Sequence, residues 1–200
     1  IVQGSVFETL RQESAEYISS LPFDGLAIGG VSVGESKKEM VKVLQWVTPL
    51  LPGDKPRHLL GVGEIDDVFA AVEYGMDTFD CVQPTRLARM GRLLVQTSTP
   101  IKSGSKLKVE SKEQDKRFTL DITKKIYTQD TDPIDSTCDC YTCTRFSRAY
   151  IHHLFHVREL LAYRLATIHN VRFMHRLLLQ IRESIVNGSF LELKKKWLAR

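Results

Sequence analysis

Three cysteines lie close together in the C-terminal third of this 200-residue chain, with the spacing Cys138-x-Cys140-x2-Cys143. Thiolates are soft ligands, and three of them with one imidazole complete the tetrahedral shell of a structural zinc site. The cluster therefore predicts one structural Zn²⁺ ion rather than disulfides, and a reducing, cytoplasmic compartment. Spacing alone leaves the fourth ligand open among the histidines that follow: His152, His153, His156, His169 and His175.

A carboxylate lies at the end of an apolar run in the segment FDCVQPTR, residues 79–86. A turn at Pro84 follows it, and then the cationic Arg86. A carboxylate held at the end of a rigid strand can act as a nucleophile. It can also cap a helix or pair with arginine, and the residue types alone leave both interpretations of Asp80 open.

The first 95 residues alternate between short apolar runs and amphipathic segments, which predicts alternating strands and helices. Strands are expected at 1–4, 23–30, 58–63 and 77–82, and helices at 6–21, from Ser36 to about 51, and from about 64 to Gly75.

Two capping boxes mark expected helix starts, Ser5 with Glu8 and Ser36 with Glu39. In the first helix the apolar positions, Phe7 among them, recur at helical spacing and predict a buried stripe. Acidic residues at 64–67 favour the N-terminus of the third helix.

Such alternation predicts right-handed crossovers and a parallel sheet. Each expected strand ends on small or polar residues, and in a (β/α)8 barrel the chemistry lies at these carboxyl ends. Four units make half of such a barrel, and a doubly wound open sheet is the alternative α/β fold. The chain is thus expected to begin inside a larger fold. Its glycine stretches match no nucleotide-binding fingerprint.

The character of the chain changes after residue 96. Residues 97–130 are polar and lysine-rich, and they predict a hairpin or insertion that is either a solvated loop or a contact for RNA phosphate. Residues 131–200 predict a zinc-binding helical subdomain, with His169 at the junction of two helices and a cationic surface tail.

The net charge of +4 is local. Residues 102–125 contain eight Lys/Arg and four Asp/Glu, an excess of +4 that equals the excess of the whole chain. Net charge therefore gives little support for nucleic-acid binding outside this segment. No apolar run approaches the length of a membrane span, so no membrane partner is expected.

The motifs FDCVQPTRLARMG, CDCYTC and TIHN, preceded by IVQGS, AIGG and LLGVGEIDD, resemble those of the queuine/archaeosine-type tRNA-guanine transglycosylases, the bacterial enzyme most closely. The resemblance covers nearly the whole chain except residues 98–120. It implies a zinc-bearing (β/α)8 barrel, of which this chain is the C-terminal half. Such pentosyltransferases exchange the wobble guanine of tRNAs with a GUN anticodon for a 7-deazaguanine, on the route to queuosine.

The resemblance also implies roles for individual residues. Asp80 is implied as the nucleophile, with Gln3, Gly29, Gly30 and Leu60 at the bound base. The implied zinc ligands are Cys138, Cys140, Cys143 and His169. Residues implied to lie along the anticodon arm of the tRNA are Gly61, Val62, Gly63, Glu64, Ile65, Asp66, Asp67, Thr85, Arg86, Leu87, Ala88 and Arg89.

The implied chemistry is consistent with these residue types. Exchange of one base for another on the same ribose keeps the anomeric configuration, which calls for two displacements through a covalent ribosyl–Asp80 intermediate. The base must leave the stack, so the site needs edge-reading groups such as the amide of Gln3. Arg86 and Arg89 can neutralise phosphates or stack on a base.

Two positions depart from the family pattern, and a third bears on the choice of base. Ser5 stands where glycine is usual, and Leu60 stands where methionine is usual and should still cover the base. Val33 resembles the bacterial form, which favours 7-aminomethyl-7-deazaguanine over queuine as the incoming base.

The second catalytic aspartate of the family has no match in this chain. We therefore expect that the chain alone neither folds stably nor catalyses, because half a barrel exposes two sheet edges. The resemblance implies a homodimer. The alternative is a non-catalytic, zinc-containing tRNA-binding subunit, against which Asp80 and the intact PTR sequence argue.

Overall fold

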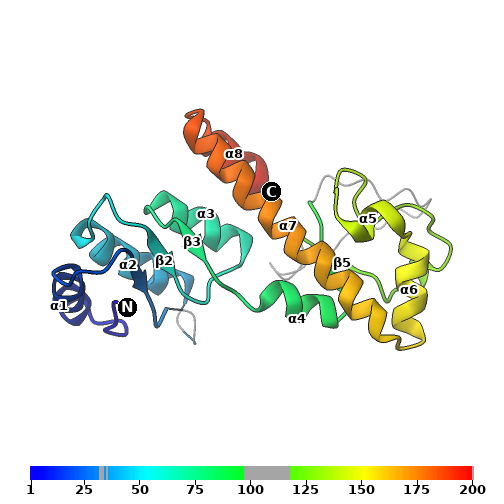
Figure 1. Ribbon diagram of the computed structural model, residues 1–200, viewed down its shortest axis with the longest axis horizontal. Coiled ribbons are helices and arrows are strands. Elements are labelled where there is room, and N and C mark those ends of the chain that lie inside the picture. The colour runs from blue at the N-terminus through cyan, green and yellow to red at the C-terminus, as the bar shows by residue number, and fades with distance from the viewer. Residues whose placement is uncertain (32–33, 35, 97–117, 200) are drawn as a thin grey trace. The chain divides into compact units, whose positions relative to one another are not determined.

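The computed structural model describes residues 1–31, 34, 36–96 and 118–199 (Figure 1). The chain forms two compact units, Ile1–Gln83 and Pro84–Arg200, which are described separately. The expectation about Val33, and most of the lysine-rich segment, lie outside the described residues.

The first unit is α/β, as the alternating pattern predicts. Its elements in chain order are α1 (Glu8–Ser19), β1 (Leu26–Ile28), α2 (Lys37–Val47), the 3-10 turn η1 (Thr48–Leu50), β2 (Arg57–Leu59), α3 (Ile65–Glu73) and β3 (Thr78–Phe79).

The three strands form one parallel sheet in the order β1-β2-β3. Val2 adds a single parallel bridge to Ile28 on the far side of β1, so the first expected strand is present only as this bridge. Each strand therefore pairs with the next one in the chain. Parallel strands joined by helices bring their carboxyl ends to one edge, where the expected site residues lie.

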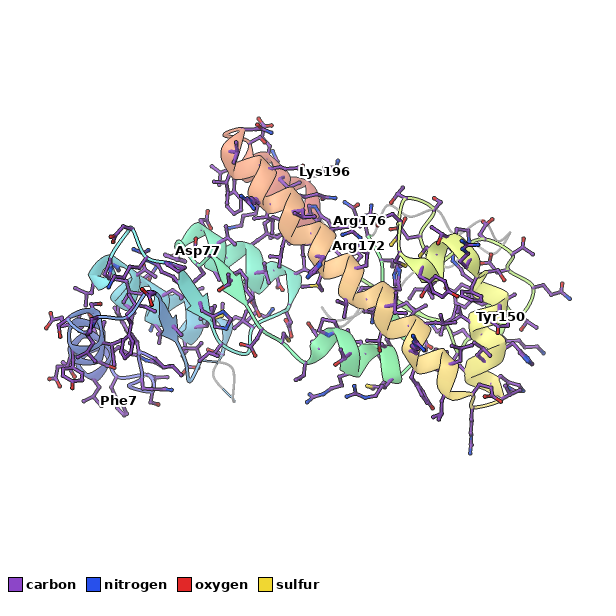
Figure 2. The ribbon with its side chains drawn as sticks, viewed as in Figure 1. Phe7, Asp77, Tyr150, Arg172, Arg176 and Lys196 are labelled. Atoms are coloured by element: carbon purple, nitrogen blue, oxygen red, sulfur yellow. The ribbon has the colours of Figure 1, made fainter. Side chains whose placement is uncertain are left out.

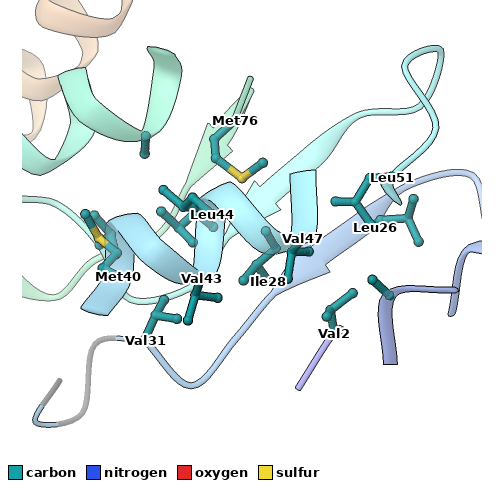
Figure 3. Packing of buried hydrophobic residues seen from close by; sticks show 14 residues of the cluster. Val2, Leu26, Ile28, Val31, Met40, Val43, Leu44, Val47, Leu51 and Met76 are labelled. Atoms are coloured by element: carbon teal, nitrogen blue, oxygen red, sulfur yellow. The ribbon is translucent and has the colours of Figure 1, made fainter. Parts of the chain in front are cut away.

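The core of this unit lies between the sheet and α2 (Figure 3). Met40, Val43, Leu44 and Val47 recur at helical spacing and are buried against Ile28 and its neighbours. The capping box at Ser36 and Glu39 is confirmed, since each side chain bonds to the other's backbone N–H. Local capping and the buried stripe thus agree on where α2 begins and which face it buries.

The expectations for the first helix are wrong in two respects. The N-cap position is occupied by Phe7, which makes no side-chain capping bond, and not by Ser5, which takes a left-handed backbone with φ of +50°. Phe7 and Leu10 are exposed, and Phe7 lies at the periphery of its unit (Figure 2). The buried face of α1 instead carries Arg11 and Ala15.

The second unit pairs a small antiparallel sheet with helices. Its elements are most of α4 (Gln83–Arg89), then β4 (Arg92–Leu94), β5 (Thr119–Asp121), the turn η3 (Lys125–Tyr127), α5 (Tyr141–Arg145), α6 (Arg148–His156), α7 (Leu160–Val186) and α8 (Phe190–Leu198).

One expectation about this unit is corrected. α7 continues unbroken for 27 residues, so His169 lies inside one helix and not at a junction. Asn170, the next residue, uses its side chain in tertiary hydrogen bonds. The cationic tail forms α8 and buries Trp197 against Phe118 and Phe173. Within the described residues, no helix is long and apolar enough to cross a bilayer.

Candidate active site and metal centre

Asp80 directly follows β3, and its carboxylate is held at one oxygen. Oδ1 accepts hydrogen bonds from the Gly61 backbone N–H at 3.0 Å and from His58 Nε2 at 3.1 Å. The bond from Gly61, followed by the bond from His58, lowers the pKa of Asp80 below its ordinary value. The side chain is 59% exposed, so an ionised carboxylate faces solvent with Oδ2 unused by these two contacts.

The turn after β2 approaches Asp80 closely because it contains two glycines, Gly61 and Gly63. Gly61 has φ of +75°, a left-handed conformation that glycine adopts without strain. A β-carbon at Gly63 would lie 2.4 Å from the β-carbon of Cys81, so only glycine fits against this side chain. Cys81 therefore packs against the turn that donates to its neighbour, Asp80.

The four residues expected at the base lie together beside this turn. A β-carbon at Gly29 would lie 2.9 Å from Gln3 Nε2 and 3.2 Å from Leu60 Cδ1, and one at Gly30 would lie 2.8 Å from Gln3 Oε1. Side chains at positions 29 and 30 would therefore displace the Gln3 amide. Their absence leaves an amide, two backbone segments and an apolar side chain at the same sheet edge as Asp80.

Arg11 holds these segments in place by hydrogen bonds to their backbone. Sequence reasoning missed this residue. It is fully buried on α1, and its guanidinium donates to the carbonyl oxygens of Gly29 and Gly30, each at 2.7 Å. It also donates to Ser5 at 2.7 Å and Val2 at 3.3 Å. The planar fork of an arginine suits such divergent acceptors.

The residues of the expected RNA-facing segment 61–67 differ in how far they are buried. Val62 and Ile65 are buried, so only backbone and the acidic side chains are open at this segment. Glu64, Asp66 and Asp67 all bond to Lys37, with distances of 2.9 Å from Asp66 and 3.0 Å from Asp67. Three carboxylates around one ammonium leave a negative surface, which does not favour a phosphate.

Burial, opposed by the bond to Lys37, raises the pKa of Asp67 to about 6. Asp67 therefore titrates above the ordinary range of aspartate.

The second expected RNA-facing segment forms α4 in the second unit. Arg86 and Arg89 are exposed and lie three residues apart, so they share one side of the helix. Ala88 is buried, while Thr85 and Leu87 are half-buried. The two arginines are thus the groups of this segment that are open to a phosphate.

Cys138, Cys140, Cys143 and His169 form one buried cluster in the second unit. One ligand atom from each lies within 4.8 Å of the others, and His169 Nδ1 is 3.2 Å from Cys143 Sγ. His169 Nε2 donates to the Leu94 carbonyl oxygen at 2.7 Å, which turns Nδ1 toward the thiols. The cluster could hold a metal ion.

The pKa shifts of Cys138 and His169 within the cluster favour the binding of a cation. Hydrogen bonds from Cys140 and Cys143 lower the pKa of Cys138. Burial tends to lower the pKa of His169, but bonds to Cys138 and Cys140 outweigh it and raise the pKa to about 9. A thiolate thus holds a proton on the imidazole, and a metal ion would compete for that position.

The loop that carries the cysteines is tied to α7 by two arginines (Figure 2). Arg172 donates to both oxygens of Asp139, and Arg176 donates to Asp135 and Thr137. Together with His169 they occupy positions i, i+3 and i+7 of one helical face. This spacing is a signal in the sequence from which the two arginines could have been assigned to the metal centre.

The family model described as queuine tRNA-ribosyltransferase matches residues 1–200. The chain belongs to the queuine tRNA-ribosyltransferase family. It is 46% identical over 198 residues to the queuine tRNA-ribosyltransferase of Roseiflexus sp. (strain RS-1), covering 99% of this chain and 45% of that protein.

Two further relatives of the same description agree. The protein of Pseudomonas putida is 46% identical over 188 residues, covering 94% of this chain and 45% of its own length. That of Haemophilus ducreyi is 44% identical over 200 residues, covering 100% of this chain and 47% of its own length. The chain thus spans less than half the length of these curated relatives.

Proposed function

We propose that this chain carries the nucleophile of a tRNA-guanine transglycosylase, which replaces the wobble guanine of a tRNA by a 7-deazaguanine. The observation that carries the proposal is Asp80: an ionised, exposed carboxylate, anchored through Oδ1 and adjacent to the turn that follows β2. Oδ2 would attack the anomeric carbon of the ribose. Gln3, Gly29, Gly30 and Leu60 would bind the base, and Arg86 and Arg89 the RNA backbone.

The half-barrel architecture is part of this proposal. Each of the three strands pairs with its neighbour in chain order, with Val2 at one side, as in successive units of a (β/α)8 barrel. The chain spans less than half the length of its relatives, which is consistent with a separate segment that forms the other half of the barrel. That half would supply the other catalytic carboxylate. The 200 residues alone would then be inactive, and the complete enzyme is the proper object of assay.

The decisive experiment measures incorporation of labelled guanine into tRNA by the complete enzyme. Asp80→Ala should lose exchange, because no carboxylate is left to form the ribosyl ester. Asp80→Asn keeps the shape and should also lose exchange, since its amide is a poor nucleophile. Normal exchange by both variants would overturn the nucleophile assignment, and this chain assayed by itself should show no exchange.

We further propose that the metal is Zn²⁺ in a structural role. Three thiolates and one imidazole supply soft, tetrahedral donors and leave no open position for substrate. Metal analysis should find about one zinc per chain, lost in Cys140→Ser but kept in Cys81→Ser. Retention of full zinc by Cys140→Ser would contradict the ligand set.

Two proposals concern partners and location. Leu179, Ile185, Val186 and Leu191 are exposed apolar residues on α7 and α8, which supports a homodimer. Light scattering on the complete enzyme should give twice the mass of one complete subunit, and a monomer at working concentration would refute the homodimer. Four free cysteines are compatible with the reducing cytoplasm in which tRNA is modified.

A further inference from the structure

His58 joins Asp80 to Thr78 across the ladder between β2 and β3. His58 and Thr78 are register partners, and His58 Nδ1 lies 2.8 Å from Thr78 Oγ1. The other ring nitrogen, Nε2, lies 3.1 Å from Asp80 Oδ1. The imidazole therefore connects a strand hydroxyl to the proposed nucleophile.

The chemistry of the three groups fixes where the protons lie. An ionised carboxylate only accepts hydrogen bonds, so Nε2 of His58 must carry the hydrogen that it donates to Asp80. In the neutral imidazole, Nδ1 is then an acceptor, and the hydroxyl of Thr78 donates to it. The Asp80 carboxylate thus selects the tautomer in which His58 donates to it, and the Thr78 hydroxyl, which can donate or accept, holds the ring in place through Nδ1.

We propose that His58 is a positioning residue that favours the free carboxylate of Asp80 over its ribosyl ester, and so sets how far the covalent intermediate accumulates. The inference rests on the proposed transglycosylase function. His58 and Gly61 both bond to Oδ1. They leave Oδ2 to attack, and they hold the carboxyl group in one orientation.

The two steps of the exchange show why the hydrogen bond from His58 stabilises the free carboxylate of Asp80 more than its ester. In the first step, an electron pair of Oδ2 forms the bond to the anomeric carbon as the bond to guanine N9 breaks, and a carboxylic acid outside these residues protonates the departing base. In the second step, that group takes the N9 proton of the incoming base, N9 bonds to the anomeric carbon, and the ester electron pair returns to Oδ2.

Oδ1 carries negative charge in the carboxylate and becomes an ester carbonyl oxygen in the intermediate. A hydrogen bond to an ionised acceptor is stronger than one to a neutral acceptor. The bond from His58 is therefore stronger before and after the covalent stage than during it. It disfavours accumulation of the ester and makes Asp80 a better leaving group in the second step.

The test measures the ratio of covalent tRNA adduct to free enzyme on denaturing gels, with the complete enzyme, saturating tRNA and one fixed guanine concentration. His58→Phe keeps the volume but removes the donor, and should raise this ratio about tenfold, the effect of one charge-assisted hydrogen bond at a half-exposed site. His58→Gln keeps an N–H donor and should stay near the wild-type ratio.

Two further variants keep the test decisive. Thr78→Val removes the hydroxyl without changing the shape, and should raise the ratio by a smaller factor, which is measurable even if His58→Phe fails to fold. His153→Phe makes the same substitution on an exposed face of α6 and should change nothing. An unchanged or lower ratio in both His58→Phe and Thr78→Val would overturn the inference. Absence of any adduct with wild-type enzyme and with both of these variants would instead defeat the proposed function.

Discussion

Arg172 donates two hydrogen bonds of 2.7 Å to the carboxylate of Asp139, which lies between two of the three clustered cysteines. The bond from Arg172 lowers the pKa of Asp139, so the pair remains ionised. His169 lies one turn earlier on the same face of α7. The helix thus supplies one metal-binding group and, from the next turn, a clamp on the loop that supplies the others.

Arg172→Gln should weaken metal retention without removing a ligand. Groups that orient metal ligands typically change affinity by about tenfold or more, and the exposure of this pair favours the lower value. Competition with a chelator on the complete enzyme measures the effect. Arg164→Gln changes an exposed arginine of the same helix and is the matched control. Equal zinc loss in the two variants would show that the clamp is dispensable.

Arg11→Lys should impair base binding more than tRNA binding. A lysine cannot reproduce four bonds to four carbonyl groups, so the segments that carry Gln3, Gly29 and Gly30 would loosen. We expect the KM for guanine to rise about tenfold, because loss of a single hydrogen bond to a charged group has an effect of this size. The KM for tRNA should change little. Steady-state exchange assays measure both constants.

Arg182→Lys, on an exposed part of α7, is the matched control for Arg11→Lys. A guanine KM that stays at the wild-type value in Arg11→Lys would limit Arg11 to a role in stability. A parallel rise in both KM values would indicate general damage to the unit.

The sequence predicted the order of strands and helices in the first unit because buried stripes and capping residues act locally. The capping box at Ser36 is an example. The similar pattern at Ser5 failed because tertiary contacts override it. Arg11 holds the Ser5 carbonyl, and the chain turns through a left-handed backbone before α1 begins.

The site was predictable only in part, for the same physical reason. The cysteines are close in sequence, so their clustering was evident, but the 27-residue continuity of α7 was not, because the side chain of Asn170 bonds to the distant Pro84, Arg92 and Leu94. Arg11 and His58 gave no distinctive signal. Their partners are backbone carbonyls and a cross-strand pair that exist only once the strands are aligned.

Ser5→Gly should stabilise the protein. Side chains are disfavoured by about 1 kcal/mol or more in the left-handed region, whereas glycine adopts it freely but loses more entropy on folding. We expect a net gain of about 0.5 kcal/mol in the free energy of unfolding. Urea denaturation of the complete enzyme measures it. Ser5→Ala keeps the β-carbon and should give no gain, and a gain as large as that of glycine would refute the strain at this position.

Asp67→Asn should stabilise the protein at neutral pH and have little effect in acid. The pKa of Asp67 is raised to about 6 by burial, so the folded state binds its proton more tightly than the unfolded state. The resulting stability is fully present below the unfolded pKa of about 4 and is lost as pH rises through 6. Asparagine resembles protonated Asp67 at every pH. The variant should therefore be more stable than wild type only at the higher pH values, where Asp67 is ionised in the folded wild type.

The carboxylate of Asp67 is 15% exposed and partly screened by Lys37, which reduces the expected difference between pH 4.5 and pH 8 to about 1 kcal/mol. Urea denaturation of wild type and variant at both pH values gives this difference, and metal release in acid affects both proteins alike. Asp54→Asn removes an exposed carboxylate and should show no such pH dependence. A stability difference between wild type and Asp67→Asn that is constant from pH 4.5 to 8 would mean that Asp67 titrates like a solvated aspartate and that Lys37 fully compensates its burial.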